Sequence, residues 1–342
     1  MHMLQRAAPA RLQLREMRRY PDVTQGPLRS RLPDRVQIVE VGPRDGLQAE
    51  ERTLPTDTKL AFIERLLDAG HTVIEATSFV SPKAVPQLAD AEEVVRRLPR
   101  RDGVRYPVLV PNERGLERAI SAGASEVAVF ASASESYSRK NLHRSRDEAI
   151  EGYRGVIRTA KDARLRVRGY LSMVIADPWD GPTPVATAVE AGRRLLEMGA
   201  DELSLGDTIG VGTPADVQRL VGAYRDAGVP ADRIGVHFHD TYGQGLANVL
   251  AALELGVATV DASTGGIGGS PFAKQAAGNL ATEDLVWLLD GFGIITGVDV
   301  RKLAAISSWL ASELGHEMPG RAARALAGEA SVRRRVAGGS PQ

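Results

Sequence analysis

Apolar positions along the chain follow two alternating spacings from about residue 35 onward. Short runs of β-branched residues, typical of strands buried on both faces, alternate with longer stretches that repeat every three to four residues, as amphipathic helices do. The predicted strands are residues 36–41, 72–76, 105–110, 126–130, 166–173, 202–205, 233–238 and 259–262. The predicted helices are residues 59–69, 85–97, 113–122, 146–163, 186–198, 215–226, 243–255 and 282–292. Eight strand–helix units in order predict an α/β fold of the TIM (β/α)8 barrel type.

A doubly wound open sheet is the main alternative to the barrel. Such a sheet more often has fewer strands and a glycine-rich G-x-G-x-x-G turn after the first of them. The turn after the first predicted strand is residues 42–46, with the sequence GPRDG, which lacks that pattern. We therefore predict the barrel, with additional C-terminal helices at residues 300–314 and 321–326 that cap it or form a dimer contact.

The two ends of the chain lack the packing pattern of its centre. Residues 1–33 are rich in arginine, poor in acidic residues and without a sustained apolar period, so we expect a mobile N-terminal extension. An arginine-rich start also imitates an organellar transit peptide, but it has no apolar run of the kind a secretory signal needs. We expect a cytoplasmic protein with a catalytic domain at residues 34–328 and a flexible tail at residues 329–342.

The composition excludes several kinds of partner and site, although it says little about the fold. Lys+Arg and Asp+Glu are both 43, so the net charge is zero, and we expect neither nucleic acid nor a membrane as the main partner. The chain has no cysteine, which excludes disulfides, thiolate metal sites and a cysteine nucleophile. Any bound metal must therefore be held by imidazole, carboxylate, amide or backbone groups.

Two histidines at the end of the seventh predicted strand mark the candidate site. Side chains alternate between the faces of a strand, so His237 and His239 point the same way. On spacing alone, two polar surface histidines at a strand end are the simpler interpretation. In a barrel, however, the first, seventh and eighth strands are neighbours, and Asp45 and Asn279 follow the first and the last of them. Two nitrogens and two oxygens suit a divalent cation such as Mg²⁺ or Mn²⁺.

Other polar residues lie where a barrel places its catalysis, just after the strands. Glu75 ends the second predicted strand and Asp207 follows the sixth, so both are candidate acids or bases. Residues 265–271 have the sequence GGIGGSP. We interpret them as a flap over the site, with a plain flexible loop or a phosphate cradle as alternatives. Residues 138–144 after the fourth strand are polar and basic, and we interpret them as a loop.

Five stretches in order resemble hydroxymethylglutaryl-CoA lyase, a family of metal-dependent TIM-barrel lyases related to Claisen condensing enzymes. They are VEVGPRDGLQ at residues 39–48, EATSFVSPK at 75–83, SLGDTIG at 204–210, HFHDTYGQ at 237–244 and AGNLATED at 277–284. The resemblance covers about residues 35–315. It implies the retro-Claisen cleavage of 3-hydroxy-3-methylglutaryl-CoA, an acyl-CoA substrate, to acetyl-CoA and acetoacetate, as in leucine degradation and ketone body metabolism. It also implies a homodimer.

The resemblance further implies roles for individual residues. Asp45, His237, His239 and Asn279 are expected to bind the metal. The expected catalytic residues are Arg44, which would stabilise the developing enolate or thioester oxygen, Asp45 or His237 as a relay for the hydroxyl proton, Glu75 and Asp207 as secondary acids or bases, and Ser270. Around them, Glu283 is expected to orient Asn279 or the flap, and Gln48, Ser78 and Ser204 to contact the substrate or the catalytic groups.

Ser270 is a departure from the family pattern. The family usually has a cysteine at this position of the flap, and that cysteine is thought to protonate the acetyl-CoA enolate. A hydroxyl is a far weaker acid than a thiol, so we expect Ser270→Cys to raise turnover. The departure leaves two alternatives to the lyase hypothesis. One is a lyase, aldolase or condensing enzyme acting on a different 3-hydroxyacyl-CoA, and the other is a barrel that binds a CoA ester without cleaving it.

Overall fold

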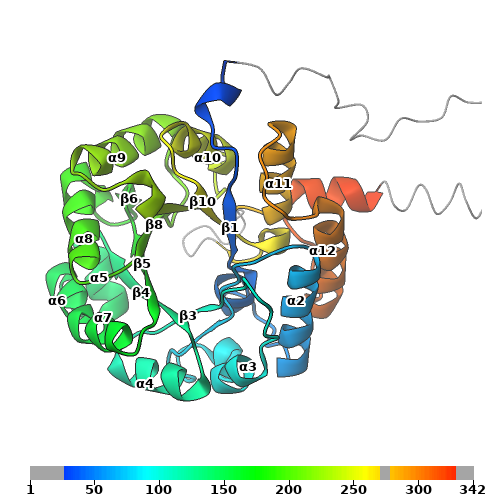
Figure 1. Cartoon of the computed structure of the whole chain (residues 1–342), viewed down its shortest axis with the longest axis horizontal. Coiled ribbons are helices and arrows are strands. Elements are labelled where there is room, and N and C mark those ends of the chain that lie inside the picture. The colour runs from blue at the N-terminus through cyan, green and yellow to red at the C-terminus, as the bar shows by residue number, and fades with distance from the viewer. Residues whose placement is uncertain (1–26, 270–277, 329–342) are drawn as a thin grey trace, which may run out of the picture.

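The computed structural model describes residues 27–269 and 278–328, and it shows the predicted barrel (Figure 1). Its sheet has eight parallel strands in the order β1-β10-β9-β8-β5-β4-β3-β2. These strands are β1 (Gln37–Glu40), β2 (Thr77–Ser78), β3 (Pro107–Leu109), β4 (Glu126–Ser132), β5 (Arg166–Ser172), β8 (Glu202–Asp207), β9 (Ile234–Phe238) and β10 (Thr259–Ala262). The ring is closed by backbone hydrogen bonds between β1 and the segment before β2, where the Glu40 N–H donates to the Val73 carbonyl and the Glu75 N–H to the Glu40 carbonyl.

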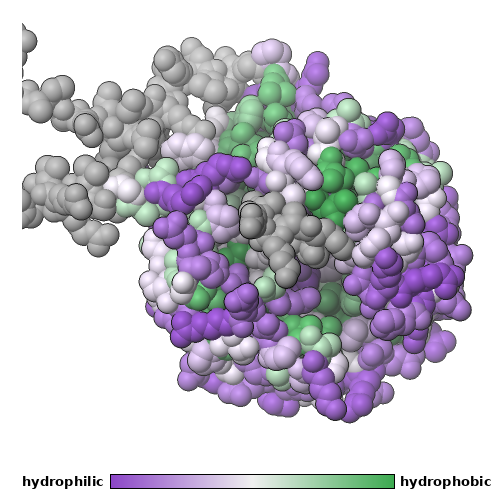
Figure 2. Space-filling view, turned by 180° about the vertical axis from the view of Figure 1, so that it is seen from behind, coloured by the Kyte–Doolittle hydropathy of each residue, from purple (hydrophilic) through white to green (hydrophobic). Residues whose placement is uncertain are grey.

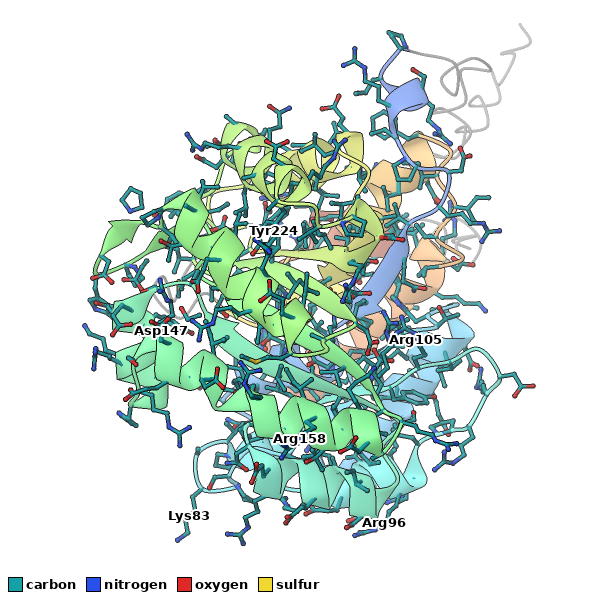
Figure 3. All side chains as sticks on the ribbon, turned by 60° about the vertical axis from the view of Figure 1, so that its left-hand side comes forward. Lys83, Arg96, Arg105, Asp147, Arg158 and Tyr224 are labelled. Carbon is teal, nitrogen blue, oxygen red and sulfur yellow. The ribbon has the colours of Figure 1, made fainter. Side chains whose placement is uncertain are left out.

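Helices surround the sheet, as the alternating pattern predicts. They are α2 (Thr56–Asp68), α3 (Ala91–Arg97), α4 (Glu113–Ala122), α5 (Glu135–Leu142), α6 (Arg146–Glu151), α7 (Tyr153–Asp162), α8 (Val185–Glu197), α9 (Pro214–Asp226), α10 (Gly245–Glu254), α11 (Thr282–Gly291) and α12 (Val300–Leu314). A further helix at residues 321–328 follows α12. Charged side chains such as Arg96, Asp147 and Arg158 project from the outer helices into solvent (Figure 3). No helix in the described ranges is long and apolar enough to cross a membrane.

Local sequence explains where several helices begin. Asn112 accepts a hydrogen bond from the Gly115 N–H at the start of α4, and Ser145 and Glu148 form a reciprocal capping box at the start of α6. Thr213 caps α9, whose first residue is a proline with no N–H to satisfy. These caps satisfy backbone N–H groups that have no partner within the helix.

The structure corrects four details of the predicted elements. The predicted helix 146–163 is interrupted at Gly152, which ends α6 and precedes α7. The predicted helix 85–97 becomes a 3-10 turn, η4 (Pro86–Leu88), followed by α3. The predicted strand 72–76 pairs only through single bridges, and the regular strand there is β2. The basic stretch 138–144 lies mostly in α5 rather than in a loop.

A small hairpin that the sequence did not predict follows β5 and consists of β6 (Ala176–Asp177) and β7 (Gly181–Pro182). Its strands have only two residues each, which is too short for an alternating pattern to reveal.

The inside of the barrel differs from the layer between strands and helices. The outer layer is an apolar core, whereas the interior contains buried charged side chains such as Arg44, Glu75, Arg168 and Asp261. Seen from the other side (Figure 2), the surface is mainly hydrophilic, with apolar side chains exposed in a hollow near its centre.

Candidate metal centre and active site

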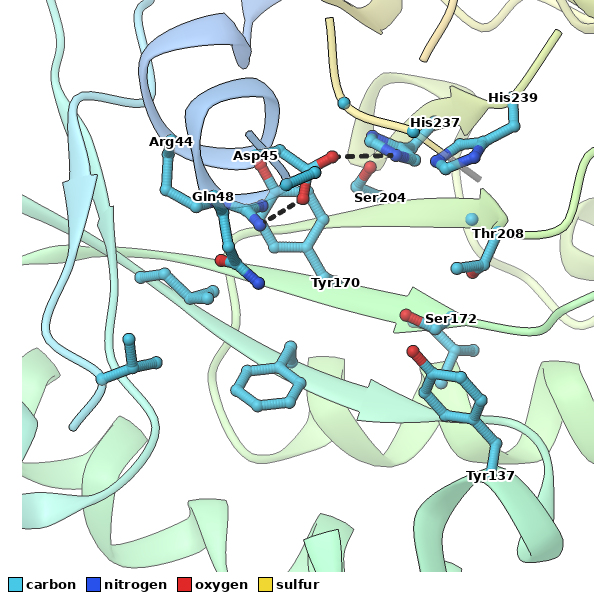
Figure 4. Close-up of a pocket in the computed structure, with 18 residues that line it drawn as sticks. Arg44, Asp45, Gln48, Tyr137, Tyr170, Ser172, Ser204, Thr208, His237 and His239 are labelled. Carbon is cyan, nitrogen blue, oxygen red and sulfur yellow. Dashed lines mark hydrogen bonds and ion pairs between the residues drawn. The ribbon is translucent and has the colours of Figure 1, made fainter. Parts of the chain in front are cut away.

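A tight turn after β1 presents two charged side chains to the cavity. The turn is a single π-helical turn, η3 (Gly42–Gly46), in which the backbone N–H groups of Arg44, Asp45 and Gly46 all donate to the Val41 carbonyl. The turn is mostly buried and lies at the carboxyl end of a barrel strand, which is where catalytic groups of this fold are expected. The cavity beside it has a volume of about 300 Å³ (Figure 4).

Three of the predicted metal ligands converge in this cavity. The ligand atoms of Asp45, His237 and His239 all lie within 4.8 Å of one another. The His237 Nε2 atom is 4.0 Å from the Asp45 Oδ2 atom, which is too far for a hydrogen bond. The two imidazole rings, on β9 and just after it, are 5.3 Å apart between centroids. Figure 4 shows both rings facing the same space as Asp45.

Asn279 is adjacent to this group. Its Nδ2 amide donates to the Asp45 Oδ2 atom at 2.8 Å and to the Ile267 carbonyl at 3.1 Å. The amide nitrogen therefore faces Asp45, whereas a cation would bind the amide oxygen. Asn279 is in position to be the fourth ligand only with its amide rotated.

The protonation states of Asp45 and His239 fit a divalent cation. Burial lowers the pKa of His239 to about 3, and the neighbouring His237 adds to this effect, so the imidazole is neutral at physiological pH. Its Nδ1 atom is buried and has no hydrogen-bond partner among the described residues. Burial opposes ionisation of Asp45, but Arg44 and His237 outweigh it and hold the pKa of that carboxyl well below its usual range. One carboxylate and two imidazoles suit Mg²⁺, Mn²⁺ or a similar ion.

Arg44 is held beside the candidate metal ligands by two carboxylates. Its Nη1 atom is 2.5 Å from the Asp45 Oδ1 atom, and its Nε atom is 2.7 Å from the Glu75 Oε2 atom. The guanidinium also lies 5.3 Å from the centre of the Tyr170 ring. Glu75 is fully buried and does not line the cavity, so the structure places it as the partner of Arg44 rather than as a group facing substrate.

The HMGL-like family model matches residues 35–310, which is most of the chain and all of the barrel. The chain belongs to the HMGL-like family. It is 50% identical to the mitochondrial hydroxymethylglutaryl-CoA lyase of Arabidopsis thaliana over 86% of its own length, and it spans only 63% of that protein.

Two solved structures of HMGL-like lyases resemble this chain over nearly their whole length. The hydroxymethylglutaryl-CoA lyase of Pseudomonas aeruginosa is 45% identical with a TM-score of 0.85, covering 87% of this chain and 99% of that one. The lyase of Acinetobacter baumannii, solved with coenzyme A and 3-methylmalate, is 36% identical with a TM-score of 0.81, covering 85% and 95%.

The remaining predicted residues of this HMGL-like chain divide into two groups. Gln48 and Ser204 line the cavity, as expected for residues that contact substrate or catalytic groups. Asp207 does not line it, because its carboxylate accepts hydrogen bonds from the N–H groups of Val211 and Gly212 and so holds the loop after β8. Burial raises the pKa of this carboxyl. The structure thus places Asp207 behind the cavity wall, and its role as a secondary acid or base stays a prediction.

Ser78 and Glu283 also lie off the cavity wall. The Ser78 hydroxyl lies 3.4 Å from the Leu109 carbonyl and accepts from the Val80 N–H. The Glu283 carboxylate accepts from the Gly265 N–H and from the Ser307 hydroxyl. Glu283 therefore fixes the beginning of the glycine-rich loop and does not contact Asn279. The predicted flap residue Ser270 lies outside the described residues.

Three residues near the site have no role among those predicted from the sequence. Tyr137 and Tyr170 both line the cavity, with Tyr137 on the wall opposite Asp45 (Figure 4). Asp261, on β10, is 3.3 Å from the His237 Nδ1 atom. A charged residue between two apolar neighbours within a predicted strand, as Asp261 is between Val260 and Ala262, is the signal that points to a buried partner.

Proposed function

We propose that the protein cleaves 3-hydroxy-3-methylglutaryl-CoA to acetyl-CoA and acetoacetate in a reaction that depends on a divalent metal, Mg²⁺ or Mn²⁺. The observation that carries the proposal is the convergence of Asp45, His237 and His239 beside Arg44 in one cavity of an HMGL-like barrel. The near-complete coverage of the Pseudomonas lyase supports the same activity. A carbon–carbon lyase is therefore the class of enzyme that fits both the site and the relatives.

The reaction requires three things of the site. The tertiary hydroxyl of the substrate loses its proton, the adjacent carbon–carbon bond breaks, and the electron pair moves onto the thioester to form the enolate of acetyl-CoA. A divalent cation bound by Asp45, His237 and His239 would supply Lewis acidity for the substrate hydroxyl and carboxylate.

The protein's own groups provide the rest of this chemistry. Arg44 presents a buried cation whose position is fixed by Glu75 and Asp45, so it can stabilise the enolate oxygen without reorganising. Asp45 or His237, which both line the cavity, would relay the hydroxyl proton. A cavity of about 300 Å³ is at the small end of ligand sites, so we expect the acyl group inside it and most of the CoA at its mouth.

A product assay tests this function. Purified protein with Mg²⁺ or Mn²⁺ is expected to release acetoacetate from 3-hydroxy-3-methylglutaryl-CoA. The release should stop when EDTA is added and resume when the metal is restored. Arg44→Gln should lower kcat/KM by about 10² to 10³-fold. The matched control is Arg118→Gln, because Arg118 pairs with Glu92 on the outside of the barrel. Turnover that is indifferent to EDTA would contradict the mechanism.

The absence of cysteine favours one second candidate, a lyase for a different 3-hydroxyacyl-CoA. We expect Ser270→Cys to raise turnover of 3-hydroxy-3-methylglutaryl-CoA several-fold, since a thiol with a pKa near 8.5 donates a proton far more readily than a hydroxyl. An unchanged or lower rate, together with faster cleavage of another acyl-CoA in a panel, would favour the second candidate.

A further inference from the structure

Asp261 occupies the centre of a buried polar cluster directly behind the candidate metal ligands. It is the third residue of β10, and its side chain points into the barrel and is fully buried. Its Oδ2 atom accepts a hydrogen bond from the Ser204 hydroxyl at 2.8 Å and lies 3.3 Å from the His237 Nδ1 atom. Its Oδ1 atom accepts from the Arg168 Nη2 atom at 2.7 Å. Every donor around this carboxylate therefore comes from another strand.

Arg168 keeps the carboxylate charged and in place. It reaches across the barrel from β5, is 1% exposed, and is also paired through its Nε atom with Glu202 at 2.9 Å. A buried ion pair of this kind costs several kcal/mol of desolvation per ion, and apolar side chains of similar volume usually stabilise a fold as well or better. Barrel interiors are usually filled with branched apolar residues. The pair is thus poorly explained as a stabilising contact.

We propose that Asp261, fixed by Arg168, is a positioning residue of the metal centre: it holds the proton of His237 on Nδ1 and so leaves Nε2 free to bind the divalent cation. The inference rests on the proposed metal-dependent function and adds to it the group that orients one ligand. Asp261 itself faces His237 and contacts neither substrate nor metal.

The geometry of His237 supports this division between its two nitrogens. Nδ1 faces Asp261, and Nε2 faces the Asp45 Oδ2 atom across a gap of 4.0 Å. An ionised carboxylate has only lone pairs to offer, so a hydrogen bond to it requires the proton to be on Nδ1. A metal-binding histidine commonly donates its other ring N–H to a carboxylate, which fixes both the tautomer and the ring orientation. His239 lacks such a partner among the described residues, because its Nδ1 atom has none.

Mn²⁺ binding to the free protein tests the proposal without relying on turnover. Asp261→Asn keeps the shape of the side chain and removes its charge. We expect this variant to raise the Mn²⁺ dissociation constant by about 10 to 100-fold in a titration followed by electron paramagnetic resonance. The matched control is Glu126→Gln, because Glu126 is a buried strand carboxylate paired with Arg105 and Arg166 at the start of β4. The control should bind Mn²⁺ within about twofold of the parent protein. Asp261→Asn binding Mn²⁺ as tightly as the parent, with thermal unfolding showing a folded protein, would overturn the proposal.

A second measurement needs no change at Asp261 and so does not depend on the folding of that variant. Long-range ¹H–¹⁵N correlation spectra of the Mg²⁺-loaded protein, with the His237 signals identified by their loss in His237→Gln, report which ring nitrogen carries the proton. We expect it on Nδ1, and a lone pair on Nδ1 would overturn the inference. If the unsubstituted protein bound neither Mn²⁺ nor Mg²⁺, the proposed function would fail first, which separates the two conclusions.

Discussion

Two carboxylates on adjacent strands, Glu40 and Asp261, are similarly buried but differ in the hydrogen-bond donors around them. They are one register position apart, since Glu40 of β1 pairs with Ala262 and Asp261 of β10 with Val39. Within the part of the chain that the structure describes, Glu40 accepts hydrogen bonds from uncharged donors, which are the Thr264 N–H and hydroxyl, the Thr282 hydroxyl and the Gly42 N–H. The His71 Nε2 atom lies 3.6 Å from its carboxylate. Asp261 accepts from the guanidinium of Arg168.

The difference in donors shifts the pKa values of the two carboxyl groups in opposite directions. Burial raises the pKa of Glu40, and its neutral donors only partly offset this. Burial also opposes ionisation of Asp261, but the Arg168 guanidinium outweighs it and lowers the pKa of that carboxyl. Glu40 joins the turn after β1 to the turn after β10 and to α11, which is a structural task. Asp261 maintains a negative charge behind a candidate metal ligand, so burial alone does not identify a functional acid.

The largest expected effect in this comparison is on stability, from Glu40→Gln. Glutamine offers one acceptor oxygen where the carboxylate offers two, and its NH₂ group faces donors, so we expect unfolding to become easier by about 2 to 4 kcal/mol. Chemical denaturation measures this. Mn²⁺ affinity should change less than about threefold, because Glu40 does not contact a metal ligand. A large loss of Mn²⁺ affinity with unchanged stability would reverse the roles assigned to Glu40 and Asp261.

A pH-dependent effect of intermediate size is expected at Glu283, which belongs to the structural side of the comparison. Burial raises its pKa from 4.5 to about 7. The folded state therefore holds this proton more tightly than the unfolded state, so the contribution of Glu283 to stability is present below pH 4.5 and is lost as the pH rises towards 7.

Glu283→Gln removes this titration. We expect its stability relative to the parent protein to improve by up to about 3 kcal/mol between pH 4.5 and pH 8. Thermal or urea unfolding at several pH values checks the trend. Parallel stability curves for the two proteins would show that Glu283 has an ordinary pKa.

The smallest expected effect is that of Ser204→Ala, which removes one neutral donor from Asp261 while Arg168 remains. One such hydrogen bond contributes about 1 kcal/mol, so Mn²⁺ affinity should fall by roughly two to fivefold. The titration is performed without substrate, because Ser204 also lines the cavity. A loss as large as that expected for Asp261→Asn would mean that the hydroxyl, rather than the charge, controls His237.

The barrel and the meeting of Asp45 with His237 and His239 were both predictable from sequence. Period-two alternation places both histidines on one face, and barrel closure makes their strand a near neighbour of β1. The comparisons confirm the family and the lyase class that the motifs predict. Glu283 bonds the beginning of the glycine-rich loop, which the prediction that it orients Asn279 or the flap allowed. The hydrogen bonds of Asp207 could not be predicted, because they depend on how the backbone after β8 turns back to bring the Gly212 N–H to this carboxylate. The start of α5 was missed although Ser134 is a good N-cap, because its polar sequence lacks a marked apolar period.

The backbone at Gly268 and the backbone at Gly278 are in close contact, and this contact limits which residue type position 278 can hold. The Asn279 N–H donates to the Gly268 carbonyl at 3.0 Å, and the Asp240 N–H donates to the Gly278 carbonyl at 2.7 Å. A Cβ atom added to Gly278 would lie only 1.8 Å from the Gly268 oxygen. A single methyl group at this position would therefore push the two backbone segments apart and move Asn279 away from Asp45. Redesign of the cavity can replace residues along its walls, but it must keep position 278 free of a side chain.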